Sequence, residues 1–301
     1  TLARTLRAKV IETHISWVLL TDDTAYKIKK PLRLTFVDYS TLQARRHFCE
    51  EEMRLNQRLA PSLYLGITRV TGTPQAPTLD STGTTLEYAV RMHRFPPGAL
   101  FSEQLAADTL PVEDVDRLAE LLAGFHLGAP RADVTSAFAT AERRRASAMA
   151  AITGVQSLAN EKEQTALRAW LRTESAALAP LWDSRKTGGF VRECHGDLHL
   201  ANVVSLDGHV LAFDCIEFDP ALRWIDVLDD AAFAVMDFSA YGRRDLAFRF
   251  LNAWLDRTGD HSCLPELRFS VIYRALVRAQ VELLRGTTRT APARNYLDTA
   301  L

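Results

Sequence analysis

The stretch His195-Gly196-Asp197-Leu198-His199-Leu200-Ala201-Asn202, continued to Asp214, decides how the rest of the chain is interpreted. Its spacing is H-x-D-x-x-x-x-N, followed by an Asp twelve residues after the Asn. A carboxylate in the position of Asp197 can take the proton of a substrate hydroxyl, and the oxygens of Asn202 and Asp214 are the hard ligands that Mg²⁺ prefers. The stretch therefore predicts a phosphoryl-transfer site, with Asp197 as catalytic base and Asn202 and Asp214 as metal ligands.

A short hairpin is predicted between Asn202 and Asp214. Val203 and Val204 enter a strand, Asp207-Gly208 is a strong two-residue turn signal, and residues 210–213 return as a second strand. We expect this turn to bring Asp214 back beside Asn202. Two oxygen ligands would then converge on one cation, as a metal that bridges nucleotide phosphates requires.

The composition fits an enzyme with one large domain or two lobes, because 47% of the 301 residues are hydrophobic and 24% are charged. No apolar run approaches the roughly eighteen residues that span a bilayer, and the first residues do not resemble a signal peptide. The four cysteines contain no C-x-x-C pair. This indicates reduced thiols and a cytoplasmic location.

The charge is divided unevenly along the chain. Residues 1–95 hold 14 Lys and Arg against 9 Asp and Glu, whereas the remainder holds 22 against 28. A basic first part suits nucleotide phosphates, and an acidic second part suits a cationic or neutral hydroxylated substrate. Neither nucleic acid nor a membrane is indicated as a partner.

Residues 1–93 are expected to form a nucleotide-binding lobe of strands and one helix. The predicted strands are 10–13, 16–21, 25–30, 65–70 and 85–92, and the predicted helix is 41–59. Alternation places Lys27 and Lys29 on one strand face, where either can reach a phosphate, although lysines also guard exposed strand edges. Lys29 is favoured because it lies deeper along the strand toward Pro31. Glu52 on the helix is expected to pair with the strand lysine.

The remaining nucleotide contacts are expected at the two ends of this lobe. No two glycines are two residues apart, so the chain has no G-x-G-x-x-G loop, and the turn at Thr13 to Ser16 must cover the phosphates with side chains or backbone amides. Residues 93–98 are expected to connect the lobes, with the backbone near Met92 to Arg94 against the adenine edge. The predicted nucleotide-binding residues are Lys29, Lys27, Glu52, Ser16, Met92 and Arg94.

Residues 94–301 are expected to form a mainly helical catalytic and substrate lobe. The predicted helices are 112–127, two within 138–180, one after Leu222, and two or three within 238–285. Residues 131–190 are interpreted as a helical insertion that either covers the substrate or is merely a solvated helix pair. His195 and Asp226 are expected to support the catalytic loop, Glu217 and Asp219 are candidates for acceptor contacts, and His126 is given no catalytic role.

Taken together, His195-Gly196-Asp197 with Asn202, the return to Asp214, Lys27 or Lys29, Glu52 and Asp226-Val227 resemble the aminoglycoside phosphotransferase and choline kinase-like family, relatives of the protein kinases. The resemblance implies an α+β, two-lobed protein-kinase-like fold, with a small antiparallel-sheet lobe carrying one helix and a larger mainly helical lobe. It also implies ATP- and Mg²⁺-dependent transfer to a hydroxyl of a small molecule such as an aminoglycoside, amino sugar, sugar or amino alcohol, with the strand lysine on the α- and β-phosphates.

A further pattern narrows the resemblance. Tyr26-Lys27-Ile28-Lys29-Lys30-Pro31 with Cys49-Glu50-Glu51-Glu52 is similar to a subgroup of uncharacterised bacterial members, some of which carry a P-loop kinase domain after this one. This sequence contains no G-x-x-x-x-G-K-[ST] motif. A P-loop kinase domain is therefore expected only as a fused or associated partner.

Three alternatives remain at this point. Asp214 is followed by Cys-Ile and soon by a predicted helix, which leaves no activation segment to present a peptide and favours a small-molecule kinase over a protein kinase. The chain can also be a catalytically silent nucleotide-binding regulatory module. Lastly, His195 and Asp197 with His209 or His261 can form the facial triad of a non-haem iron oxygenase.

Overall fold

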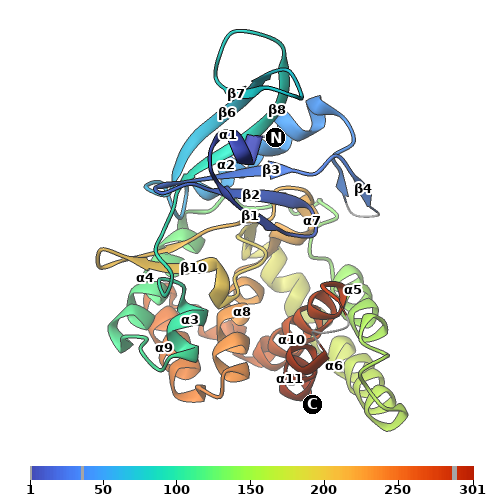
Figure 1. Cartoon of the computed structure of the whole chain (residues 1–301). Coiled ribbons are helices and arrows are strands. Elements are labelled where there is room, and N and C mark those ends of the chain that lie inside the picture. Colours follow the sequence, from blue (N-terminus) through green and yellow to red (C-terminus); the bar gives the residue numbers. More distant parts are fainter. Residues whose placement is uncertain (1, 35–36, 287–289) are drawn as a thin grey trace. The chain divides into compact units, whose positions relative to one another are not determined.

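The structure is a computed structural model that describes residues 2–34, 37–286 and 290–301 (Figure 1). Its contacts divide the chain into two compact units: unit 1 is Thr1–Ala99 with Leu211–Pro220, and unit 2 is Leu100–Val210 with Ala221–Leu301. The expected lobe boundary was residue 93. Unit 1 also takes in the later segment because Phe213 packs on Phe95, with ring centroids 5.5 Å apart, and joins the apolar cluster around Val90.

Unit 1 is built on a curled antiparallel sheet. Its elements are α1 (Leu2–Thr5), β1 (Lys9–Glu12), β2 (Ser16–Leu20), β3 (Thr24–Lys29), β4 (Arg33–Leu34), β5 (Val37–Asp38), α2 (Leu42–Asn56), β6 (Tyr64–Gly72), β7 (Pro77–Leu79) and β8 (Thr85–His93). Six strands pair in the order β1-β2-β3-β8-β6-β7, and β4 pairs with β5 in a separate ribbon. The expected strands and helix are present, and α1, β4, β5 and β7 are additional elements that were not predicted.

Helix α2 supplies the long helix of this unit and packs on β8 and β6. Thr41 starts it, since its hydroxyl accepts a hydrogen bond from Ala44 N at 3.1 Å. The helix ends at Asn56 and not at Leu59 as expected, because the chain turns toward Pro61, which cannot continue a helix. Four residues earlier on the same face, Glu52 is fully buried like Asn56.

The second part of the chain is mainly helical, as expected. Its elements are α3 (Phe101–Ala106), α4 (Val112–Gly128), α5 (Ala141–Gly154), α6 (Glu161–Thr187), β9 (Val191–Glu193), the 3₁₀ turn η1 (Leu200–Asn202), β10 (Val203–Leu206), β11 (His209–Ala212), α7 (Pro220–Arg223), β12 (Trp224–Asp226), α8 (Val227–Ala240), α9 (Arg244–Thr258), η2 (His261–Glu266), α10 (Leu267–Leu284) and α11 (Thr290–Ala300). Helices α5 and α6 are the predicted pair, whereas α11 lies beyond the predicted helices. No helix of the described residues combines the length and apolar character that a bilayer crossing requires.

The predicted hairpin is also present. Strands β10 and β11 form a two-stranded sheet, and the two residues between them, Asp207 and Gly208, have φ values of 50° and 78°. Positive φ at both central residues is required by the type I′ turn, whose twist matches that of the two strands it connects. Asp and Gly adopt it at low cost.

Helix α8 lies at the centre of unit 2, where α9, α10 and α11 all pack against it (Figure 1). Every residue from Val227 to Phe238 is buried. Three of them, Asp229, Asp230 and Asp237, are carboxylic acids in an otherwise apolar segment. A buried carboxylate requires hydrogen bonds or a cation. Two of these three residues, Asp230 and Asp237, bond to the backbone of the segment from His195 to Asn202.

Candidate active site

The segment His195 to Asn202 forms a loop between β9 and β10, and two carboxylates of α8 hold its backbone by hydrogen bonds. Asp230 accepts hydrogen bonds from the backbone N–H groups of His195 (2.9 Å) and Gly196 (2.8 Å). Asp237 accepts one from Leu200 N at 2.7 Å. Since residues 230 and 237 are about two helical turns apart, they lie on the same face of α8. This face therefore holds both ends of the loop.

The supporting role expected of Asp226 is corrected to Asp230. Asp226 caps the start of α8, where its Oδ1 accepts from Leu228 N at 2.9 Å. Its two oxygens also accept hydrogen bonds from Arg185, at 2.7 and 2.8 Å. The hydrogen bonds of Asp226 are therefore made to α8 and Arg185 and not to the loop. The sequence signal for the correct residue is a pair of acids, Asp230 and Asp237, inside an apolar helix.

His195 and Gly196 shape the loop itself. His195 is fully buried and its Nδ1 accepts from Asp197 N at 3.3 Å, which braces the loop from within. Gly196 has a φ of 89°, a backbone conformation that residues with a Cβ rarely adopt. The pair thus turns the chain so that the next residue, Asp197, projects outward with 32% of its side chain exposed.

Asp197 is held in the ionised form that a general base needs. His199 Nδ1 accepts from Ala201 N at 3.2 Å, so the Nε2 of the neutral ring carries the hydrogen, and this atom lies 3.5 Å from Asp197 Oδ2. Burial by itself would raise the pKa of Asp197, but the contact with His199, with smaller contributions from Arg278 and His195, holds it well below its ordinary value. His199 was not predicted to contribute; its position two residues after Asp197 is the signal that was missed.

Asn202 closes the loop. Its Nδ2 donates to Asp197 O at 3.0 Å, so its side-chain oxygen is the atom that a cation would take. Asn202 belongs to unit 2 and Asp214 to unit 1. Their binding of one shared metal ion stays a prediction.

A second cluster of charges lies within unit 1. Lys27 Nζ bonds to Asp214 and lies 2.9 Å from Glu52 Oε1, whereas Lys29 Nζ lies 2.7 Å from Glu52 Oε2 and bonds to Glu217. Glu52 therefore bridges both strand lysines, and pairing of this α2 residue with the strand was predicted. Burial opposes its ionisation, but the two lysines lower the pKa of Glu52 to about 2.

The two lysines have different access to solvent. Lys29 is 1% exposed and is enclosed by Glu52, Glu217 and the Tyr39 ring, whose centroid is 5.2 Å from its Nζ. Lys27 is 13% exposed and its partner Asp214 is 44% exposed. The structure thus leaves Lys27 more accessible to solvent than Lys29, the lysine that was expected to contact phosphate. The position of Lys29 farther along the strand places it in the protein interior.

Two residues that the sequence interpretation missed, Tyr64 and Asn56, hold Asp214 and the residue that follows it. Asp214 has a φ of 65°, which is uncommon for a residue with a side chain. Its N–H donates to Tyr64 Oη at 3.2 Å, and the following Cys215 N donates to Asn56 Oδ1 at 2.9 Å. The signal for Asn56 was its place one turn after Glu52.

Glu217 was expected to be a candidate for acceptor contacts, but the structure places it against the lysine cluster. Tyr39 Oη donates to Glu217 at 2.6 Å, and Lys29 bonds to it from the other side. Glu217 is also buried. It supports the lysine cluster from within unit 1 and is not on a surface that meets solvent.

The expected contacts of Ser16, Met92 and Arg94 with a nucleotide are not supported. The Ser16 hydroxyl is buried, while Thr13 and His14 form the exposed part of the turn. Arg94 N donates to Asp23 O at 2.8 Å. Met92 lies inside β8, in register with both neighbouring strands, and its side chain is buried. These groups are therefore used in building the sheet.

The metal alternatives can be tested on the described residues. Among them, the one group of three side chains whose ligand atoms lie close enough for a metal is His126, Cys194 and Asp230. Neither His209 nor His261 joins His195 and Asp197 in such a group. The geometry thus does not support the iron triad.

A comparison with protein-family models matches residues 22–269 of the chain to the phosphotransferase enzyme family. Uncharacterised proteins of Mycobacterium bovis and Mycobacterium tuberculosis are 33% identical to the chain over 281 residues, which cover 92% of it. The match covers 55% of these relatives, so the chain spans about half of their length.

Solved structures share the fold at low sequence identity. A glucosamine kinase has a TM-score of 0.55 at 16% identity, with 97% of this chain and 77% of that chain covered. An ethanolamine kinase of Plasmodium vivax has a TM-score of 0.53 at 12% identity, covering 99% and 81%. A choline kinase of Cryptosporidium parvum has a TM-score of 0.52 at 11% identity, covering 97% and 88%. The chain therefore belongs to the phosphotransferase enzyme family and has the α+β fold of its small-molecule kinases.

Proposed function

We propose that the protein transfers the γ-phosphoryl group of ATP to a hydroxyl of a small molecule, with Mg²⁺ as the metal and Asp197 as the catalytic base. The observation that carries this proposal is the loop 195–202, in which an ionised, partly exposed carboxylate is fixed by α8. An ionised base within reach of a hydroxyl can take its proton as the phosphoryl group arrives.

Unit 1 would bind the nucleotide. Kinases require a lysine on the phosphates that is paired with a helix glutamate, and a metal-binding aspartate nearby. Lys27, Glu52 and Asp214 form such a set. In this proposal Lys27 contacts the α- and β-phosphates, Asp214 and Asn202 bind Mg²⁺, and the adenine edge meets the backbone from Phe95 onward, past the last sheet hydrogen bonds of β8.

The acceptor is proposed to be a hydroxylated amine, such as an amino sugar, an aminoglycoside or an amino alcohol. Three structural neighbours are named as kinases of glucosamine, ethanolamine and choline. An acidic second part of the chain favours a cationic acceptor of this kind. A neutral sugar is the next class to test.

The proposal includes a cytoplasmic location, where ATP is available and thiols stay reduced. All four cysteines are free and buried. It also includes a partner domain, because the curated relatives are about twice as long as the matched region. A P-loop kinase domain, fused or associated, is the candidate.

The test is an ADP-release assay with MgATP across a panel of amino sugars, aminoglycosides, amino alcohols and neutral sugars. We expect acceptor-dependent ADP from the wild type and a loss of at least about 1000-fold in kcat for Asp197→Asn, which removes the base. Nucleotide binding by calorimetry serves as the folding control. Binding without ADP production from the wild type, across the whole panel, would instead indicate a silent regulatory module.

A further inference from the structure

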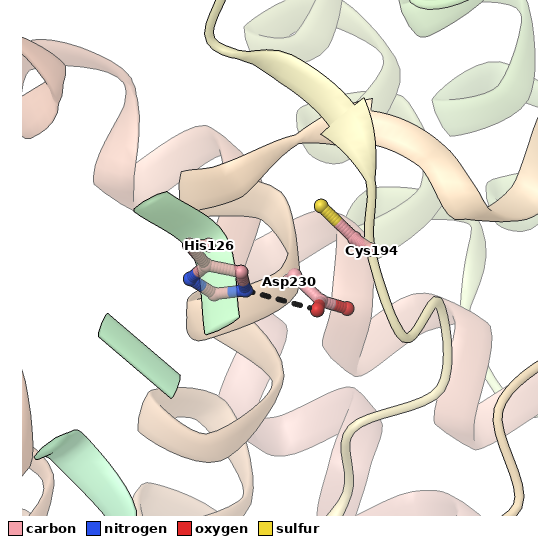
Figure 2. A group of neighbouring side chains, drawn as sticks. All are labelled: His126, Cys194 and Asp230. Atoms are coloured by element: carbon pink, nitrogen blue, oxygen red, sulfur yellow. Dashed lines mark hydrogen bonds and ion pairs between the residues drawn. The ribbon is translucent and has the colours of Figure 1, made fainter. Parts of the chain in front are cut away.

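Each unit holds one of the proposed functional carboxylates by means of buried side chains. In unit 2 the loop with Asp197 is bonded to Asp230, whose Oδ2 lies 3.1 Å from His126 Nε2, as Figure 2 shows. In unit 1 the carboxylate is that of Asp214, the proposed metal ligand, whose side chain is 44% exposed. A carboxylate this exposed is not enclosed by the protein. Its direction therefore depends on what holds the backbone of its own segment.

The backbone of that segment is held firmly at Asp214 and at the next residue. Asp214 has a φ of 65°, a strained conformation that persists only where surrounding contacts enforce it. Its N–H donates to Tyr64 Oη at 3.2 Å, and the N–H of the fully buried Cys215 donates to Asn56 Oδ1 at 2.9 Å. These two bonds fix the beginning of the segment.

The end of the segment is fixed by Glu217, three residues after Asp214. The Glu217 carboxylate is 4% exposed, bonds to Lys29 of β3, and accepts a hydrogen bond from Tyr39 Oη at 2.6 Å. Tyr39 is itself fully buried, and its ring centroid lies 5.2 Å from Lys29 Nζ. We call Glu217, Lys29 and Tyr39 the Glu217 clamp. It joins the segment after Asp214 to the sheet.

The protonation states in the clamp favour strong bonds. Burial opposes the charge of Lys29, but the carboxylates of Glu217 and Glu52 outweigh it and raise the pKa of the ammonium group. Burial, followed by the charge of Glu217, raises the pKa of Tyr39, so the phenol keeps its hydrogen and donates it. Hydrogen bonds from an ammonium group and a phenol to a carboxylate are charge-assisted and directional. With Lys29 only 1% exposed, the clamp holds the chain and is not a surface for a ligand.

We propose that the Glu217 clamp positions Asp214 for metal binding, with Glu217 and Tyr39 as positioning residues that contact neither the metal nor the nucleotide. The clamp restrains the chain after Asp214, while the packing of Phe213 on Phe95 restrains it before. Without the bonds to Glu217 the strained residue is restrained from one side only. Its backbone can then relax, and the carboxylate turns away from the cation.

The proposal rests on the proposed binding of MgATP, and its test uses three variants of the clamp. Glu217→Leu removes the clamp and leaves Lys29 its bond to Glu52, at 2.7 Å. Glu217→Gln keeps a side-chain oxygen that can accept from Tyr39. Tyr39→Phe removes the phenol hydroxyl alone.

Two control variants lie on the opposite face of the same sheet, in the apolar cluster that includes Ile28. Tyr26→Phe removes a phenol hydroxyl from a half-buried residue of β3 and is the matched control for Tyr39→Phe. Val70→Ala shortens a buried side chain of β6 and controls for a loss of stability alone.

The Kd for ATP, measured by calorimetry with and without Mg²⁺, separates metal binding from nucleotide binding. Glu217→Leu should raise the Kd for MgATP about tenfold and leave the Kd for metal-free ATP within roughly twofold of the wild type, because only the metal ligand is misplaced. Glu217→Gln should restore most of the affinity, and Tyr39→Phe should show a smaller loss. Both controls should bind MgATP as the wild type does. If Glu217→Leu keeps the wild-type Kd for MgATP, or weakens metal-free ATP equally, the clamp does not position the metal ligand.

Hydrogen exchange tests the clamp independently of the proposed function. The amides of Asp214 and Cys215 should exchange at least about tenfold faster in Glu217→Leu than in the wild type, and not in Val70→Ala, when each protein is measured equally far below its Tm. If Mg²⁺ does not change the affinity of the wild type for ATP, the proposed function is wrong, and faster exchange still shows that the clamp holds Asp214. Unchanged exchange at both amides overturns the clamp, whatever the affinities.

Discussion

At the scale of single residues, hydrogen bonds to the ring nitrogens of two histidines determine which nitrogen of each neutral ring carries the hydrogen. The Nδ1 atoms of His195 and His199 each accept a hydrogen bond from the backbone N–H of the residue two positions later in the chain. Each neutral ring therefore carries its hydrogen on Nε2, and in His199 this atom faces Asp197. The two histidines thus act as local caps of the loop, and His199 also favours the ionised form of Asp197.

The lysines make the sharpest prediction at this scale. Lys27→Ala should lower kcat about 100-fold or more with a small change in Tm, because the side chain is partly exposed and proposed to contact phosphate. Lys29→Ala should instead lower stability by about 3–5 kcal/mol, since it leaves Glu52 and Glu217 buried without their cation. ADP production and thermal unfolding of the two variants distinguish these effects.

Lys9→Ala provides the matched control, because Lys9 is an exposed lysine on the edge strand β1. It should change neither measurement. A Lys29→Ala protein that unfolds at the wild-type temperature but no longer binds ATP would reverse the assignment of the two lysines.

At the scale of elements, two arginines attach the predicted insertion to the rest of unit 2. Arg144 on α5 lies 2.9 Å from Asp229 and 2.8 Å from Glu266, and Arg185 on α6 lies 2.9 Å from Glu266. Arg185 also pairs with Asp226 and Asp260. The helices α5 and α6 are therefore joined to α8 and η2 by buried ion pairs, which argues against the interpretation as a solvated pair.

This cluster predicts a dependence of stability on pH. Burial and the charges of Asp226 and Asp229 outweigh the two arginines and raise the pKa of Glu266 from 4.5 to about 8. The native state therefore keeps a proton that the unfolded chain releases. This contribution is fully present below pH 4.5 and is lost as the pH rises through 8, by no more than about 1.4 kcal/mol per unit.

Glu266→Gln keeps the shape and remains neutral at every pH. We expect its free energy of unfolding, measured in urea, to rise relative to that of the wild type between pH 5 and pH 8 and then to level off. A constant difference over this range would mean that Glu266 is ionised in the native protein. Glu161→Gln, at an exposed position on α6, controls for general effects of removing a carboxylate.

At the scale of the whole molecule, the proposed roles fall in different units. The lysine cluster with Asp214 belongs to unit 1, and the loop with Asp197 and Asn202 belongs to unit 2. The segment Leu211–Pro220 is the exception to sequence order, since it follows the loop in the chain but packs in unit 1. If the proposed roles are correct, a substitution of Asp197 in unit 2 leaves the proposed nucleotide contacts of unit 1 in place.

Nucleotide affinity should therefore separate the two groups of residues. Asp197→Asn should leave the Kd for MgATP within roughly twofold of the wild type, whereas Lys27→Ala should weaken it about tenfold or more. The double variant should match Lys27→Ala, because Asp197→Asn by itself is expected to leave the affinity for MgATP almost unchanged. Calorimetric titration gives all three values. A Kd that Asp197→Asn raises as much as Lys27→Ala would contradict the division of roles.

Local sequence patterns determined much of the fold and of the site. The period of apolar residues predicted the helices α2 and α4, an Ala- and charge-rich composition predicted the pair α5 and α6, and Asp207-Gly208 predicted the hairpin, because these features depend on neighbours within a few residues. The spacing from His195 to Asn202 identified the loop. The pairing of Glu52 with the strand also followed from its place on the apolar side of α2.

The tertiary structure alone decided which of several similar residues takes each part. Lys27 and Lys29 share a strand face, so alternation cannot distinguish them, and their difference in burial comes from Tyr39 and Glu217, distant in sequence. Asp226 and Asp230 lie four residues apart at the start of α8. Asp226 caps the helix, whereas Asp230 accepts a hydrogen bond from the backbone of the loop. The local spacing of residues determines which face of a strand or helix a side chain lies on and where turns form. The burial of a side chain and the choice of its bonding partners depend instead on chain segments that meet only after folding.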